Sequence, residues 1–219
     1  MKREHIILGI LILAGLALIA GFIYITSPSY EHRQAEKIFQ HALSILESGD
    51  YFEAEIKIRQ AIELAPEDAR YHAAMGKALE KEGFYQGAKR ALEQAVRLAP
   101  GNPEYIFEIG RFEQRNGKED MAMEAFEEVI GIDPYHILAL YQLGAIYAKQ
   151  GRYAEAAQIF ERITAKYPTE AEAYNNLGFC YFNLERFPEA RDMFEKALEI
   201  NPDFIDAKKS IQIIEQELK

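Results

Sequence analysis

The sequence predicts an all-α solenoid of five helix–turn–helix units, preceded by one transmembrane helix and followed by a C-terminal capping helix. Three observations support this fold class. The first is a repeat of 34 residues, without insertion or deletion, marked by Pro66, Pro100, Pro134, Pro168 and Pro202. The second is a set of small residues that keep the same interval. The third is a stretch of twenty residues without charge or proline, Ile6–Ile25.

Each repeated position has a physical role. Proline cannot continue a helix, so each proline ends one helix and forces a turn. Small residues fall in the middle of the first helix of each unit, where its partner must approach closely: Ala42, Gly76, Gly110, Gly144 and Gly178. The partner helix has its own small series: Ala54, Ala88, Ala122, Ala156 and Ala190. A glycine series that fails only at Glu185 ends the first helices: Gly49, Gly83, Gly117 and Gly151.

These features resemble the tetratricopeptide repeat, a pattern of small, aromatic, glycine, alanine, large apolar and proline positions. The fourth unit shows the pattern as Leu143-Gly144, Tyr147, Gly151, Tyr153, Ala156, Phe160 and Pro168. The resemblance covers residues 35–204 in five units: 35–68, 69–102, 103–136, 137–170 and 171–204. It implies a right-handed superhelix that binds other proteins.

The N-terminal part of the chain is predicted to hold the protein in a membrane. Residues 1–5 precede Ile6–Ile25, which is just long enough to span a bilayer as a helix. A cleavable signal peptide is the competing interpretation, but its apolar core is normally shorter, so an uncleaved signal-anchor is favoured. Lys2 and Arg3 put the N-terminus in the cytoplasm and the repeats in the periplasm or outside the cell. The opposite orientation, with cytoplasmic repeats, stays open.

Residues 26–34 form a linker and the start of the first solenoid helix. Pro28 is expected to end the membrane helix, and Ser29 to cap a new helix that begins near Tyr30. The tether is short, so the solenoid stands close to the bilayer. Further along the chain, Asp68 and Asn102 are the predicted caps of the second and third units.

Residues 205–219 begin like a sixth unit and stop after one helix. Five residues recur there at helical spacing and are predicted to cover the fifth unit: Ile205, Lys208, Ile211, Ile214 and Leu218. Such a helix caps the core that an open end of the array would expose.

Several kinds of chemistry are not expected. The formal net charge is −10, which argues against nucleic acid as a partner. The five histidines show no metal-ligand spacing, so no metal or other cofactor is predicted. The single cysteine, Cys180, lies in an apolar stretch and is expected to be buried. No catalytic set converges, so the sequence predicts a protein that is not an enzyme.

One polar residue interrupts the family pattern. Glu113 stands where the fourth and fifth units have Tyr147 and Tyr181. It is either a polar contact to a ligand or, more plainly, a carboxylate that reaches the surface along its stem.

In the tetratricopeptide family, fixed positions of each first helix line a concave groove. Carried onto this sequence, they give a candidate partner-binding set: Phe39, Leu43, Ala73, Lys77, Lys81, Phe107, Arg111, Arg115, Tyr141, Ala145, Lys149, Asn175, Phe179 and Phe182. The lysines and arginines of this set form a basic strip within an acidic protein. Most of its aromatic residues lie in the C-terminal half of the chain. The expected partner is therefore a protein or peptide segment with acidic groups and apolar anchors.

The function that these features favour is a membrane-anchored scaffold that assembles a cell-envelope complex, for secretion, a pilus, cytochrome maturation or the cell wall. Two alternatives stay open. One is an adaptor that recruits soluble factors to a membrane or organelle from the cytoplasm. The other is a non-catalytic regulatory subunit of a membrane enzyme or protease. Self-association into a homo-oligomer is also open.

Overall fold

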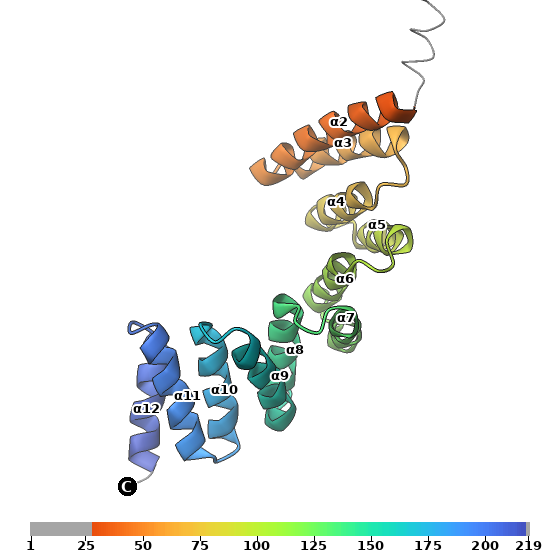
Figure 1. The fold of residues 1–219 in the computed structure, drawn as a ribbon. Helices are drawn as coiled ribbons and strands as arrows, with labels where there is room; N and C mark the ends of the chain where they lie inside the picture. Colours follow the sequence, from red (N-terminus) through yellow and green to blue (C-terminus); the bar gives the residue numbers. More distant parts are fainter. Residues whose placement is uncertain (1–27, 218–219) are drawn as a thin grey trace, which may run out of the picture. The chain divides into compact units, whose positions relative to one another are not determined.

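The computed structural model describes residues 28–217, which form eleven α-helices and no strand (Figure 1). The chain divides into two compact units, residues 1–100 and residues 101–219. The described helices of unit 1 are α2 (Pro28–Ser48), α3 (Tyr51–Leu64), α4 (Ala69–Lys81) and α5 (Tyr85–Leu98). Those of unit 2 are α6 (Pro103–Arg115), α7 (Glu119–Ile132), α8 (Ile137–Lys149), α9 (Tyr153–Lys166), α10 (Ala171–Asn183), α11 (Phe187–Ile200) and α12 (Ile205–Glu217). The all-helical solenoid is confirmed.

The predicted membrane segment, residues 6–25, lies outside the described residues. Among residues 28–217, no helix has both the length and the apolar character needed to cross a bilayer. The chain is already helical at Pro28, ahead of the start expected near Tyr30.

Consecutive helices pair as antiparallel hairpins, such as α2 with α3 in unit 1 and α10 with α11 in unit 2 (Figure 1). The small residues of the first helices make this pairing close. A Cβ added to Gly110 would lie 2.6 Å from the Phe126 ring, and one added to Gly178 would lie 2.9 Å from the Phe194 ring. The large side chain of the second helix therefore occupies the space that a side chain on the first would need.

Four glycines end first helices, as predicted, and all four have positive φ: Gly49, Gly83, Gly117 and Gly151. At the fifth such position Glu185 adopts the same left-handed backbone, with φ of 59°. The turn geometry is thus kept where the glycine is lost, at the steric cost that a Cβ brings to this region.

The predicted caps are present. Asp68 accepts a hydrogen bond from the Arg70 N–H at 3.0 Å, and Asn102 accepts one from the Glu104 N–H at 3.0 Å. Both bonds satisfy a backbone donor that the first turn of a helix leaves without an intrahelical partner.

The capping helix α12 is present, but its buried face differs from the prediction. Ala207 and Ile214 are fully buried, whereas Ile205 is 63% exposed and Lys208 lies in solvent. The prediction was right for Ile214 and wrong for Ile205, because the small Ala207 is the residue of the first turn that is buried. Leu218 lies outside the described residues.

We expect Gly110→Ala to destabilise the protein by about 2 kcal/mol, because the added methyl group overlaps the Phe126 ring and forces α6 and α7 apart. The measurement is urea unfolding followed by circular dichroism. Gly131→Ala in α7 is the control, since a Cβ there meets nothing within 4 Å and should raise stability by about 0.5 kcal/mol. Equal effects of the two substitutions would contradict the packing argument.

Candidate functional site

Two aromatic residues of the candidate groove set are buried in the packing of the helices. Phe39 is 4% exposed and its ring lies 4.5 Å from that of Tyr71. Phe107 is 3% exposed and contacts the rings of Phe126 and His136, with centroids 5.5 and 5.0 Å away. The prediction that they line an open groove is wrong, because a neighbouring aromatic side chain covers each ring.

The remaining groove positions of unit 1 lie on α2 and α4. Leu43 and Ala73 are half-buried, and Leu43 packs against the apolar core of the unit. Lys77 and Lys81 are exposed and lie one helical turn apart, so they share one face of α4.

Two basic residues of the candidate set in unit 2, Arg111 and Lys149, already contact carboxylates. The Arg111 guanidinium donates to Glu108 at 3.0 Å. Lys149 of α8 forms an ion pair with Glu119 of α7, and Arg115 is exposed at the end of α6. The predicted basic strip therefore consists of an exposed lysine pair in unit 1 and, in unit 2, the carboxylate-bound Arg111 and Lys149 with the exposed Arg115.

The most open apolar surface of the set surrounds Phe179 on α10. This side chain is 48% exposed, although it is a large hydrophobic residue. It forms a wall of two hollows. One, of 220 Å³, is lined by Ala145, Ala148, Phe160, Asn176 and Phe179. The other, of 150 Å³, is lined by Phe179, Phe182, Phe194, Ser210 and Ile213. We call these two hollows the Phe179 groove.

Neighbouring side chains hold the aromatic residues of the Phe179 groove in place. The ring of Tyr153 meets that of Phe179 edge-on, with centroids 6.0 Å apart. Phe187 meets Phe182 in the same way at 5.4 Å. Aromatic pairs in this geometry are mutually stabilising. The groove is therefore preformed rather than a set of loose side chains.

The sequence identified some residues of the groove and missed others. Ala145, Phe179 and Phe182 belong to the candidate set. Ser210 and Ile213 of α12 were missed, because only the packing of the capping helix against α10 and α11 brings them to the hollow. Neither residue belongs to the face of this helix that the sequence predicted to cover the fifth repeat, so the sequence did not indicate this contact.

Tyr141 and Asn175 occupy the same repeat position on α8 and α10 and are both half-buried. Within the described residues, the Tyr141 hydroxyl and Asn175 Oδ1 have no hydrogen-bond partner. Burial, and then the carboxylates of Glu172 and Glu170, raises the pKa of Tyr141. The hydroxyl therefore stays protonated at neutral pH and keeps its hydrogen as a donor.

Glu113 does not reach the surface, so the plainer of the two interpretations is wrong. Its side chain is buried, and Lys118 Nζ lies 3.4 Å from Glu113 Oε2. The equivalent positions of the next unit hold Tyr147 and Arg152, and the guanidinium of Arg152 lies 4.3 Å from the centre of the Tyr147 ring. The third repeat therefore has an ion pair where the fourth repeat has a cation–π contact.

Cys180 is buried, as predicted, and burial raises the pKa of its thiol to about 12. A thiol with so high a pKa is protonated at neutral pH and is a poor nucleophile. Among residues 28–217, no group of three or more histidine, cysteine or acidic side chains could hold a metal ion.

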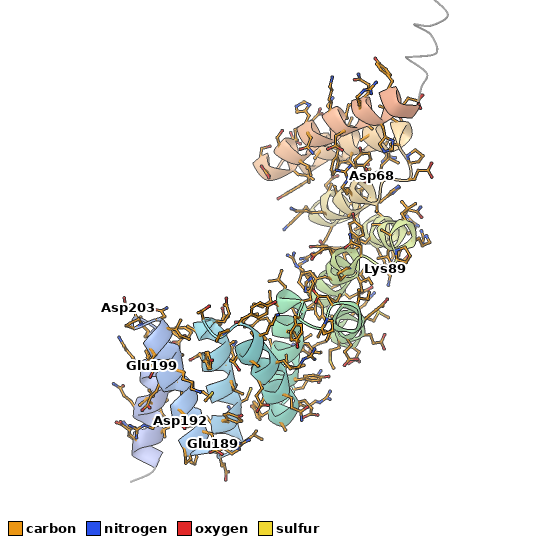
Figure 2. The ribbon with its side chains drawn as sticks, in the orientation of Figure 1. Asp68, Lys89, Glu189, Asp192, Glu199 and Asp203 are labelled. Carbon is orange, nitrogen blue, oxygen red and sulfur yellow. The ribbon has the colours of Figure 1, made fainter. Side chains whose placement is uncertain are left out.

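Acidic side chains project from the second helix of the last hairpin. Figure 2 shows Glu189, Asp192 and Glu199 along α11, with Asp203 in the turn that follows. Asp192, Glu199 and Asp203 are exposed. Part of the negative charge of the chain therefore lies on exposed side chains of α11 and the turn after it, none of which lines the Phe179 groove.

Comparison with known proteins identifies the repeats. Three family models, each described as tetratricopeptide repeat, match residues 73–137, 113–175 and 171–204. No curated protein matches the chain.

Several solved structures share the fold. YrrB, described as a tetratricopeptide protein with an unusual peptide-binding site, is 23% identical, with a TM-score of 0.64 over 80% of this chain and 90% of its own. MamA is 21% identical, with a TM-score of 0.66 over 77% and 92%. The pilF protein of Pseudomonas aeruginosa is 16% identical, with a TM-score of 0.67 over 86% and 92%. At these identities the likeness shows the fold alone.

We expect Lys118→Ala to destabilise the protein by about 1–2 kcal/mol, because it removes the ammonium group beside the buried Glu113 carboxylate. Arg152→Ala is the matched control and should cost less, since Tyr147 is uncharged and the carboxylate that also pairs with Arg152, that of Glu155, is 44% exposed rather than buried. Urea unfolding measures both. The double variant Glu113→Gln with Lys118→Ala should recover part of the loss; a loss equal to the sum of the two single changes would refute the coupling.

Proposed function

Because this chain belongs to the tetratricopeptide-repeat family, we propose that it is a protein–protein interaction scaffold that binds an extended segment of a partner in the Phe179 groove. The observation that carries this proposal is the 48% exposure of Phe179 between two apolar hollows. A large exposed aromatic residue with apolar surface on both sides is typical of a binding site.

The size of the hollows favours side chains over a small-molecule ligand. Their volumes of 150 and 220 Å³ fall below the range of about 300–1,000 Å³ that is usual for small-molecule pockets. Two apolar side chains of one segment, placed on either side of Phe179, would cover the ring. Burial of each such side chain contributes about 1.5–3 kcal/mol before the entropy of ordering is subtracted.

The repeat itself shows that Phe179 is not needed for the fold. The equivalent positions of the other units hold Leu43, Lys77, Arg111 and Ala145. An aromatic residue at the fifth unit therefore adds surface that the hairpin does not require. The peptide-binding site for which YrrB is described supports the same use of this fold.

The basic residues favour acidic groups beside the apolar anchors of the partner. A partner carboxylate near Arg111 or Lys149 would exchange with Glu108 or Glu119, which now hold these cations. Such an exchange changes the free energy little, so its main effect is on which partner binds and how fast.

We further propose that residues 6–25 anchor the scaffold in a membrane, with the N-terminus in the cytoplasm and the repeats on the other side. The length of the apolar stretch and the basic residues before it support this arrangement. A scaffold held there would assemble a complex of the cell envelope.

The groove is tested by placing a photo-crosslinking phenylalanine analogue at position 179 of the full chain in its native cells. We expect it to capture a partner segment with two apolar residues, identified by mass spectrometry, because the groove has two hollows. Position 205 is the control, since Ile205 is exposed outside the groove. Phe179→Ala should weaken binding of that segment about tenfold or more, and Ile205→Ala should leave it unchanged. The same captured products at both positions would refute the groove.

The orientation is tested with reporters fused after Lys219. We expect an alkaline phosphatase fusion to be active and a cytoplasmic fluorescent-protein fusion to be dark, because the basic residues precede the apolar stretch. Moving the charges of Lys2 and Arg3 to the far side of the stretch is the control and should weaken this bias. An inactive phosphatase and a bright fluorescent fusion in the unaltered chain would reverse the proposed orientation.

A further inference from the structure

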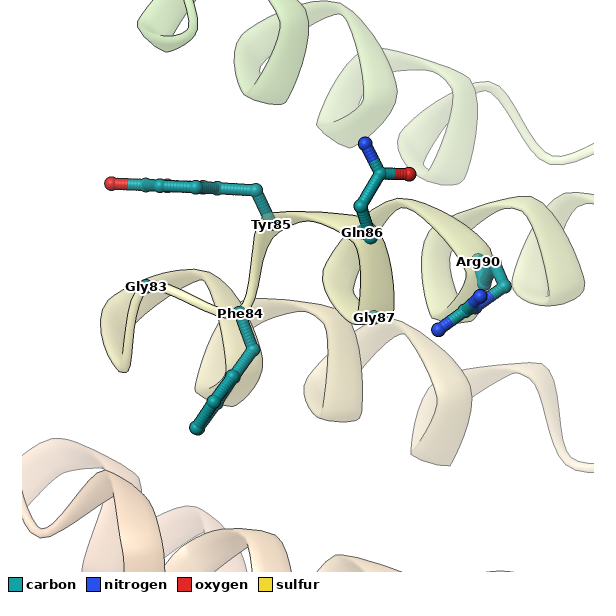
Figure 3. Close-up of a pocket in the computed structure, with 6 residues that line it drawn as sticks. All are labelled: Gly83, Phe84, Tyr85, Gln86, Gly87 and Arg90. Carbon is teal, nitrogen blue, oxygen red and sulfur yellow. The ribbon is translucent and has the colours of Figure 1, made fainter.

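A second apolar surface lies in unit 1, at the turns between its paired helices. Phe52, in the first turn of α3, is 65% exposed. Phe84 and Tyr85, at the start of α5, are 60% and 53% exposed. Figure 3 shows the two rings of the α4–α5 turn pointing in different directions, with Tyr85, Gln86 and Arg90 lining an open hollow. Three large aromatic side chains of one unit thus lie in water.

The other 34-residue repeats provide an internal control for the two phenylalanines. At the position of Phe52 they have Gln86, Asp120, Ala154 and Pro188. At the position of Phe84 they have Asp50, Lys118, Arg152 and Arg186. The fold therefore accepts polar, charged or small residues at both places. Phe52 and Phe84 expose apolar surface that the hairpins do not need, and such surface is typical of a contact with a partner.

Carboxylates lie close to these two phenylalanines in the sequence. Asp50 precedes Phe52 and caps α3, and Glu55 follows it on the same helix. Glu82 ends α4, two residues before Phe84. Burial, and then the charges of Glu55 and Asp50, raises the pKa of Glu82. Because α3 packs against α4, the carboxylates of Asp50 and Glu55 act on that of Glu82.

The acidic charge is only partly balanced. Arg59 forms an ion pair with Glu55, but within the described residues Glu82 Oε1 is buried without a hydrogen-bond partner. Lys81 directly precedes Glu82 in the sequence, and Arg90 lines the hollow beside Tyr85. A cation placed between the two turns would relieve the repulsion among Asp50, Glu55 and Glu82.

We propose that Phe52 and Phe84, with the carboxylates of Asp50, Glu55 and Glu82, form a second docking surface that binds a basic segment of a partner protein. A lysine or arginine of that segment lies over the exposed rings, where the aromatic faces attract a cation, and its charge meets the carboxylates. We call this the aromatic turn surface. Its chemistry is opposite to that of the Phe179 groove, which favours an acidic segment.

Charge selects this occupant over others. An anionic lipid surface or a nucleic acid would meet carboxylates and be repelled. A second copy of the chain carries net charge of −10 and would have to bring a local basic element, such as α5 with Lys89 and Arg90. Self-association is therefore the alternative that the experiment must separate.

The test measures fluorescence anisotropy of two labelled twelve-residue peptides added to the full chain in detergent. One peptide alternates arginine and lysine with serine, and the other has glutamate in place of every basic residue. We expect the basic peptide to bind, and to bind more weakly as salt is raised. We expect no binding of the acidic peptide at this surface. Equal binding of the acidic peptide to a Phe179→Ala variant would overturn the proposal.

The variants use residues that the repeat already carries at these positions. Phe52→Ala removes one ring, and Phe84→Arg removes the other and adds a cation. The double variant should lose about tenfold or more in affinity for the basic peptide, whereas Phe179→Ala should keep it. Circular dichroism and urea unfolding check that each variant is folded. Affinity unchanged in the folded double variant would overturn the proposal.

Sedimentation equilibrium separates a basic partner from a second copy. We expect the unaltered chain and the double variant to have the same mass. A dimer that the double variant abolishes would instead assign the aromatic turn surface to self-association and overturn the basic-partner assignment.

Discussion

The described helical hairpins depend on one steric fit, in which a small residue of the first helix faces a large apolar side chain of the second. Gly110 with Phe126 and Gly178 with Phe194 are two examples, and in each a Cβ would overlap the ring. Because the fit recurs every 34 residues, the lengths of helices and turns are fixed with it. Equivalent positions then lie on equivalent faces of each hairpin. The fit therefore determines which positions of each hairpin face outward and are available for binding, whatever side chains occupy them.

Because the repeat is so regular, a residue that departs from it needs a specific explanation, either in packing or in binding. The ion pair of Glu113 and Lys118 replaces a tyrosine–arginine contact and serves packing, so its departure is compensated within the hairpin. The exposed rings of Phe179 and Phe84 have no such compensation. Their exposure loses hydrophobic stabilisation, and the other units show that the fold does not demand it. We therefore expect binding where large apolar side chains are exposed without contributing to the packing of the repeats.

The two proposed surfaces differ in chemistry as well as place. The Phe179 groove has apolar hollows and cations already held by carboxylates, which suits a segment with apolar anchors and acidic groups. The aromatic turn surface joins exposed rings to partly unbalanced carboxylates, which suits a basic segment. A scaffold with both can hold two different partners, or two regions of one partner, without competition between them. Such paired engagement raises the effective concentration of each segment at its site.

The sequence alone determined the helical hairpins, their turns and their caps, because these depend on local backbone chemistry at fixed spacing. Asp68, Asn102 and the positive-φ glycines are where the repeat predicts them. The sequence also predicted Phe179 and Phe182 as groove residues, and both line a hollow in the structure. It did not show that Phe39 and Phe107 are buried, that Glu113 meets Lys118, or that Ser210 and Ile213 complete a hollow. Those facts belong to the tertiary structure, because burial depends on which side chain of a neighbouring element lies over a position, and spacing along one helix carries no record of that neighbour.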